Sequence, residues 1–201
     1  AASYGADAIT LDVVSRIQTL FEAPNAAVYL AATGTAANTL ALACLCPPWA
    51  TIYCSPVAHI QEDECNAPEF FTGGAKLNLV GSDDKLAPAA LEQAILGTAQ
   101  GDVHGPQRGP VSLTQITEKG RIYTLSELSE LCAVAKAYDL PVHMDGARFA
   151  NAIAALGCSA AEMTWRCGID ALTFGGTKNG LMGVEAVIFF DPKYAGEFEL
   201  R

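Results

Sequence analysis

The strongest constraint on the fold is a pair of short apolar segments, 140–148 and 170–180, which each run into a turn of small residues. They read LPVHMDGAR and DALTFGGTKNG, and the residues between them suffice for the helical crossover that parallel strands require. Asp145 and Lys178 therefore follow the carboxyl ends of two predicted strands. Ligands bind at that edge of an open α/β sheet, so we expect this carboxylate and this amine to face one pocket.

An aspartate and a lysine in these positions suit pyridoxal 5′-phosphate (PLP) chemistry. The amine of Lys178 can form a Schiff base with the cofactor aldehyde, and Asp145 can keep the pyridine nitrogen protonated so that the ring accepts electrons. The structural alternative is that Asp145 caps the next helix and Lys178 is a solvated loop residue. Strand-end carboxylates and loop lysines are common, so the spacing alone leaves both interpretations open.

A candidate phosphate site follows the predicted strand 26–31. There the turn Thr33-Gly34-Thr35 leads into a predicted helix, 36–45, whose free N–H groups and positive dipole end suit an anion. The hydroxyl of Thr35 adds a donor, and a simple helix cap is the alternative interpretation. The turn is not a Walker loop, because no Gly-Lys-Ser/Thr follows it.

His59 leaves the carboxyl end of another predicted strand, 51–54. An imidazole there can stack on a cofactor ring and act as a base near neutral pH, whereas a surface or hydrogen-bonded structural role is the alternative. Of the other histidines, we expect His143 inside its strand to be a core residue and His104 to lie on the surface. His59 is therefore the candidate functional histidine.

The rest of the pattern alternates strands with helices. Apolar runs predict further strands at 76–80, 111–116 and 184–190. Helical spacing predicts helices at 12–23, at 88–96, and from a Thr124–Glu127 capping box onward. With 201 residues, of which 51% are hydrophobic, the chain can bury one sizeable core, and we expect an α/β domain with a mostly parallel sheet flanked by helices.

The motifs HMDGARFANA (143–152) and TFGGTKNG (173–180) resemble the large domain of fold-type-I PLP enzymes, specifically the L-threonine aldolases of the β-eliminating lyase group. The resemblance runs from about Tyr4 to Arg201, and the D-G-A-R plus T-K-N-G pair is fairly specific. It implies a three-layer, aminotransferase-like fold and makes residues 1–201 the PLP-binding large domain.

Two shorter segments share the resemblance. TGTAAN (33–38) is similar to the family's S-G-T-x-x-N element, with Thr33 in place of Ser and Asn38 matching. AHIQEDE (58–64) is similar to the stretch that supplies a stacking histidine, and Glu64 matches a family acid there. The stretch TQITE (114–118) departs from the Asn-Thr-His-Asn that family members often carry, and the departure concerns the substrate contacts.

The resemblance also implies a role for each candidate residue. Lys178 bonds the cofactor, Asp145 holds the pyridine nitrogen, Gly34 and Thr35 bind the phosphate, and His59 stacks on the ring and serves as base. For Arg148, it implies contact with the cofactor's phenolic oxygen or with the substrate carboxylate, whereas a surface ion pair is the ordinary fate of such an arginine. For Tyr4, it implies a place near a neighbouring subunit's active site, with a frayed terminus as the alternative.

The implied reaction is PLP-dependent cleavage of β-hydroxy-α-amino acids, L-threonine or L-allo-threonine, to glycine and an aldehyde. The same cofactor residues would serve a phenylserine aldolase or a β-eliminating lyase, and a non-catalytic α/β domain could retain the fold. A Rossmann dinucleotide domain is disfavoured, because no G-x-G-x-x-G follows a strand.

Composition excludes several other classes. The net charge of −10 and the lack of a basic stripe disfavour nucleic acid as a partner. The longest apolar runs fall far short of the ~20 residues of a membrane helix, and the seven cysteines form no C-x-x-C pair, so we predict no metal site. We expect a cytoplasmic enzyme with reduced cysteines.

The resemblance finally implies a larger assembly. Family members have a small C-terminal domain that supplies an arginine for the substrate carboxylate, and this chain, which begins at Ala1 and ends at Arg201, is expected to be part of such a longer enzyme. A homodimer or homotetramer is implied in the same way.

Overall fold

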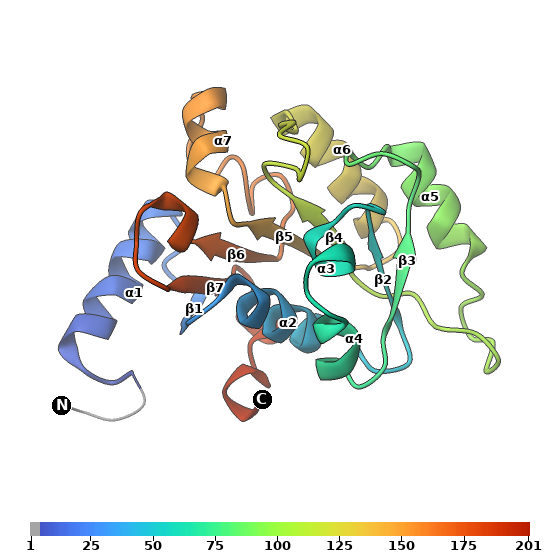
Figure 1. The fold of residues 1–201 in the computed structure, drawn as a ribbon, viewed down its shortest axis with the longest axis horizontal. Coiled ribbons are helices and arrows are strands. Elements are labelled where there is room, and N and C mark those ends of the chain that lie inside the picture. Colours follow the sequence, from blue (N-terminus) through green and yellow to red (C-terminus); the bar gives the residue numbers. More distant parts are fainter. Residues whose placement is uncertain (1–4) are drawn as a thin grey trace.

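A computed structural model describes residues 5–201, and within that range seven strands form one sheet, in the order β1-β7-β6-β5-β4-β2-β3 (Figure 1). The strands are β1 (Ala27–Ala31), β2 (Thr51–Cys54), β3 (Lys76–Leu79), β4 (Val111–Thr114), β5 (Val142–Gly146), β6 (Ala171–Gly175) and β7 (Glu185–Phe189). β7 runs antiparallel to both of its neighbours, β1 and β6, and the other adjacent pairs are parallel. The mostly parallel sheet predicted from the sequence is thereby confirmed.

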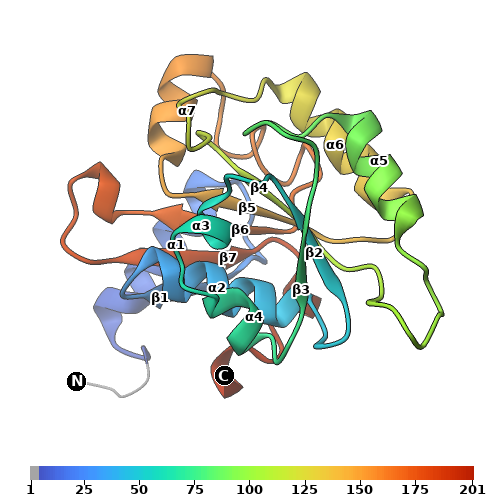
Figure 2. The same cartoon turned by 45° about the vertical axis from the view of Figure 1, so that its right-hand side comes forward.

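Helices cover both faces of this sheet (Figure 2). The α-helices are α1 (Ala8–Leu20), α2 (Gly34–Leu45), α3 (His59–Glu62), α4 (Ala67–Phe71), α5 (Pro88–Gly97), α6 (Leu125–Lys136) and α7 (Phe149–Leu156). Short 3₁₀ helices follow as η1 (Thr177–Asn179), η2 (Pro192–Tyr194) and η3 (Phe198–Leu200). α2 packs on one face, and α5, α6 and α7 supply side chains to the core on the other, so the domain has three layers.

The alternation of side chains along β7 explains how one strand serves both cores. Val187 and Phe189 pack against Ala37 and Ala41 of α2, whereas Ile188 belongs to the core on the opposite face. All residues of β5 and of β7 are buried, as expected for strands that are covered on both sides. The alanines of α2 let that helix lie close to the sheet.

Several element boundaries differ from the predicted ones for identifiable reasons. The strand predicted at 111–116 ends at Thr114, because residues 117–121 close a turn in which the Thr117 N–H donates to the Arg121 carbonyl. The helix predicted at 36–45 begins at Gly34, because the Thr33 hydroxyl accepts from the N–H of Ala36 and caps it. The predicted capping box between Thr124 and Glu127 is confirmed.

The two histidines assigned to structural positions lie where they were predicted. His143 is fully buried in β5, with its Nδ1 3.0 Å from Ser112 Oγ and its Nε2 3.1 Å from Thr173 Oγ1. Burial lowers the pKa of His143 well below its ordinary value, so the ring is neutral at pH 7. His104 is exposed. The described part of the chain contains no helix with both the length and the apolar content needed to cross a membrane.

Candidate active site

The carboxyl ends of β1, β5 and β6 meet around a cavity of about 300 Å³. Its wall combines predicted site residues with groups from the neighbouring turns. It is formed by Ala32, Thr33, Gly34, Thr35, Asn38, His59, Asp145, Ala147, Thr177, Lys178, Gly183 and Glu185. Five residues singled out from the sequence, Gly34, Thr35, His59, Asp145 and Lys178, thus share one cavity.

Asp145 is the buried acid of the cavity. It lies in β5, only 4% exposed, and its Oδ1 accepts a hydrogen bond from the N–H of Ala147 at 2.9 Å. Its Oδ2 accepts a second bond from Nδ2 of Asn38, also at 2.9 Å. Two donors therefore fix the orientation of a carboxylate that the sheet has removed from water.

Asn38 connects Asp145 to a second buried acid. Its Nδ2 also donates to Oε1 of Glu64 at 2.8 Å, so both amide hydrogens of Asn38 are used on carboxylates. Glu64 is 3% exposed, and burial raises the pKa of its carboxyl group. Neither Oδ1 of Asn38 nor Oε2 of Glu64 has a hydrogen-bond partner within the described chain.

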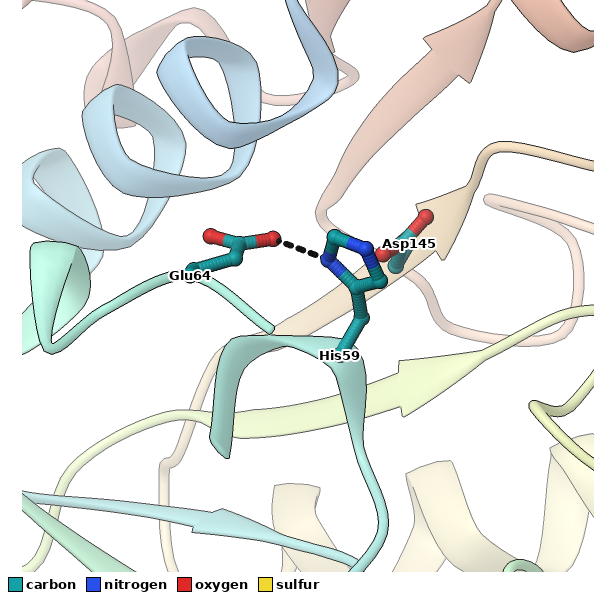
Figure 3. A group of neighbouring side chains, drawn as sticks. All are labelled: His59, Glu64 and Asp145. Carbon is teal, nitrogen blue, oxygen red and sulfur yellow. Dashed lines mark hydrogen bonds and ion pairs between the residues drawn. The ribbon is translucent and has the colours of Figure 1, made fainter. Parts of the chain in front are cut away.

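His59 completes the chain of polar contacts as the first residue of α3. Its Nδ1 lies 2.8 Å from Oε1 of Glu64, and the ring projects from the start of α3 toward Asp145 (Figure 3). When the Glu64 carboxylate accepts this bond, Nδ1 carries the hydrogen, and Nε2 is the ring nitrogen that can accept a proton. The order of contacts is Asp145, Asn38, Glu64, His59.

The same three titratable groups lie within metal-binding range of one another. Single ligand atoms of His59, Glu64 and Asp145 all lie within 4.8 Å. Nδ2 of Asn38, however, donates a hydrogen bond to each of the two carboxylates. A hard cation is bound by oxygen atoms, and an N–H group that points into the cluster would repel it. The donor set fits a hydrogen-bonded network better than a cation.

Lys178 enters the cavity from η1, directly after β6. Its residue is exposed, and the turn around it is held by two bonds: Gly176 N–H donates to Oε2 of Glu185 at 3.0 Å, and Asn179 Nδ2 donates to the Gly175 carbonyl at 2.7 Å. These bonds hold the backbone on both sides of Lys178, and its amine has no hydrogen bond or ion pair with any other residue from 5 to 201.

The turn Thr33-Gly34-Thr35 forms the other side of the cavity. Gly34 and Thr35 are the first residues of α2, whose first backbone N–H groups have no intrahelical acceptor. A Cβ added at Gly34 would meet no atom within 4 Å. This end of the cavity therefore offers open space beside N–H donors and a positive dipole end, which suits an anion.

Arg148 and Tyr4 were expected near the site, whereas Glu185 was not. Arg148 occupies the N-cap position of α7 without a side-chain cap bond, and the cavity wall includes Ala147, the residue before it, rather than Arg148 itself. Tyr4 lies outside the described residues. Glu185, a buried wall residue, was not predicted; the signal was an acid at the start of the otherwise apolar strand EAVIF.

Comparison with known proteins finds relatives over nearly the whole chain. The family described as "Beta-eliminating lyase" matches residues 1–198. The chain is 46% identical over 200 residues to proteins named low specificity L-threonine aldolase from Pseudomonas sp. and Pseudomonas aeruginosa, which covers 99% of this chain and 57% of each relative. The chain thus spans little more than half the length of the curated relatives that it matches.

Solved structures agree on the fold. A Leishmania major threonine aldolase superposes with a TM-score of 0.91 at 28% identity, over 98% of this chain and 57% of that one. A structure titled SPT with PLP superposes with a TM-score of 0.68 at 18% identity, over 98% of this chain and 45% of that one, which is a likeness of fold. The predicted three-layer, aminotransferase-like fold is confirmed.

Proposed function

The chain belongs to the beta-eliminating lyase family, and on that premise we propose that residues 1–201 are the PLP-binding large domain of an enzyme that cleaves β-hydroxy-α-amino acids. L-Threonine and L-allo-threonine are the proposed substrates, and glycine and an aldehyde are the proposed products. The relatives named low specificity L-threonine aldolase support this choice. Because the chain spans 57% of their length, the proposal concerns the longer enzyme to which this domain corresponds.

The cavity offers a suitable partner for each polar group of the cofactor, namely its phosphate, its aldehyde and its ring nitrogen. The α2 N-terminus with its open Gly34 suits a phosphate, the free amine of Lys178 suits an aldehyde, and the buried carboxylate of Asp145 suits a protonated ring nitrogen. The single observation that carries the proposal is that these three kinds of group line one 300 Å³ cavity.

Each residue then has a defined task. Gly34 and Thr35 would hold the phosphate, and Asp145 would keep a proton on the ring nitrogen. Lys178 would bond the aldehyde and, when the substrate amine takes its place there, would be free to move the proton at the substrate α carbon. When bound, the cofactor supplies a conjugated ring that withdraws electrons from the substrate α carbon. Arg148 is proposed to contact the phenolic oxygen or the substrate carboxylate.

His59 is proposed to cover the cofactor ring and to act as the base for the substrate β-hydroxyl group. Glu64 holds the hydrogen on Nδ1, so Nε2 is the atom that accepts the hydroxyl proton, directly or through a water. Loss of that proton drives cleavage between the α and β carbons. Asn38 keeps Glu64 and Asp145 in place while both stay out of water.

The test combines a spectrum with product analysis on the full-length enzyme. We expect bound PLP to give an absorbance band near the visible edge that is lost in Lys178→Ala and kept in Lys76→Ala, an exposed lysine on β3. Threonine should yield equimolar glycine and acetaldehyde. Ammonia and a keto acid would instead identify a β-eliminating lyase, preference for phenylserine would identify a phenylserine aldolase, and absence of the band would identify a non-catalytic domain.

We also propose a cytoplasmic homodimer or homotetramer. α1 has no buried residue and exposes Ile9, Leu11 and Leu20, which supports contact with another surface. All seven cysteines are free, which supports a reducing compartment. Light scattering of the purified enzyme tests the oligomer.

A further inference from the structure

Glu118 is a half-buried acid whose role the proposed chemistry does not explain. It lies four residues beyond the end of β4, in the stretch that departs from the family pattern. Its Oε1 accepts a hydrogen bond from the backbone N–H of His59 at 2.9 Å and another from the Thr114 hydroxyl at 2.8 Å. One carboxylate oxygen therefore joins the start of α3 to the end of β4.

α3 needs this outside contact. It has four residues, too few for a helix to be stable by itself, and Ala58 at its N-cap position has no side chain that could accept a hydrogen bond. The N–H of His59 is a free donor at this helix start, and Glu118 satisfies it from a position distant in the sequence. The cap of α3 is thus supplied by another element.

The other end of the contact is fixed to the strand that carries Asp145. Thr114 pairs with Asp145 in the register of β4 and β5, and the N–H of Gln115 donates to the Asp145 carbonyl at 2.9 Å. The path from His59 through Glu118 and Thr114 therefore ends opposite Asp145. It passes through different residues from the Asn38–Glu64 path on the cavity side.

We propose that Glu118 is a positioning residue that fixes His59 relative to Asp145 and so places the imidazole over the cavity. This inference rests on the proposed function for its catalytic consequence, but not for the contact itself. Glu118 holds the backbone of His59, whereas Glu64 holds its ring. Losing Glu118 leaves the His59 N–H unpaired in a partly buried place and lets α3 move.

The second oxygen of Glu118 adds a chemical detail. Oε2 is shielded from solvent and has no partner within residues 5–201. Burial raises the pKa of Glu118, and an unpaired buried oxygen favours the neutral acid. A glutamine at this position has the same shape as that acid and keeps an oxygen to accept both bonds, so Glu118→Gln is the matched conservative variant.

The experiment compares Glu118→Ala, Glu118→Gln and Thr114→Val in the full-length protein, with Glu62→Ala, an exposed residue of the same helix, as control. The first readout is hydrogen exchange of the segment containing His59, measured by mass spectrometry without cofactor. We expect Glu118→Ala to speed its exchange about tenfold, Thr114→Val to do so about threefold, and the other two variants to match wild type.

The second readout is steady-state kinetics with threonine. Misplacement of the base should lower kcat about tenfold or more in Glu118→Ala with little change in KM, and Glu118→Gln should restore it. Unchanged exchange in both Glu118→Ala and Thr114→Val overturns the proposal, as does failure of glutamine to rescue. Thr114→Val keeps the test valid if Glu118→Ala does not fold. If the wild-type enzyme does not cleave threonine but hydrogen exchange is still faster in Glu118→Ala, the proposed function is refuted and the positioning contact is supported.

Discussion

The amide nitrogen of Asn38 lies 2.9 Å from Oδ2 of Asp145, although 107 positions separate the two residues. The same nitrogen lies 2.8 Å from Oε1 of Glu64. Burial, and to a smaller extent the nearby Asp145, raises the pKa of Glu64, and the two buried carboxyl groups share one neutral donor. Asn38 makes it possible for Asp145 to be oriented by protein hydrogen bonds and still present its carboxylate to the cavity.

Replacing Asn38 should therefore weaken both fold and site. Asn38→Ala leaves two buried acids without a donor, and we expect a loss of about 1–3 kcal/mol in the free energy of unfolding, together with weaker PLP binding. Urea denaturation and PLP titration measure the two effects. Asn151→Ala, at an exposed position of α7, is the control, and equal effects of both substitutions would contradict the assigned role.

The raised pKa of Glu64 predicts a pH-dependent stability. Burial raises this pKa above its ordinary 4.5, so the folded protein keeps the proton to higher pH than the unfolded chain does. The contribution of Glu64 to stability is full below pH 4.5 and falls as the pH rises through the folded pKa. Glu64→Gln should remove that fall, so that its stability relative to wild type improves from pH 4 to pH 7. Denaturant titrations over this range, with Glu62→Gln as control, measure it; parallel curves count against the prediction.

The lowered pKa of His143 predicts that its contribution to stability changes with pH in the opposite direction. Burial lowers its pKa from the ordinary 6.5. Below pH 6.5 the unfolded chain therefore binds a proton at this ring, whereas the folded chain does not. Stability should therefore fall as the pH is lowered below 6.5, until the folded pKa is reached. His143→Gln should flatten this slope, at a cost of about 1 kcal/mol at pH 7 from less ideal bonds to Ser112 and Thr173. Thermal unfolding from pH 4 to pH 7 tests it, and exposed His104→Gln should retain the slope.

Close contact between β6 and the turn after β5 predicts that Gly175 tolerates no side chain. A Cβ there would lie 2.5 Å from the carbonyl oxygen of Ala147 and 2.6 Å from its Cα. Gly175→Ala should cost about 1–3 kcal/mol and should weaken PLP binding, because it separates the segments that carry Asp145 and Lys178. Gly97→Ala meets no atom within 4 Å and is the control. The melting temperature and the PLP dissociation constant report the two effects.

Local sequence patterns were sufficient to predict the strands and turns that carry the site residues. Asp145 and Lys178 could be placed at strand ends because an apolar run followed by a small-residue turn is readable within ten residues, and parallel strands bring such ends together. The capping box of α6 was equally local. In each case the signal and its cause lie in the same short stretch.

Contacts between residues that are far apart in the sequence could not be predicted from such local patterns. The bond from Asn38 to Asp145 and the bond from His59 to Glu118 join different layers of the fold, and their geometry depends on how the sheet is assembled. A motif match drew attention to Asn38 without indicating its function. The departure of TQITE (114–118) from the family pattern drew attention to that stretch without indicating a contact for Glu118. Because the strand was predicted to continue to residue 116, the turn that carries Glu118 was not predicted.

The position of β1 has a consequence for synthesis of the protein. Within the described sheet β1 pairs with β7 alone, so residues 27–31 leave the ribosome early and find their neighbour only after residues 185–189 have emerged. Nearly all of residues 1–189 must therefore be translated before the turn Thr33-Gly34-Thr35 can be held beside Asp145 and Lys178. Until then the edge of an apolar strand stays unpaired, a state in which a nascent chain is prone to aggregate.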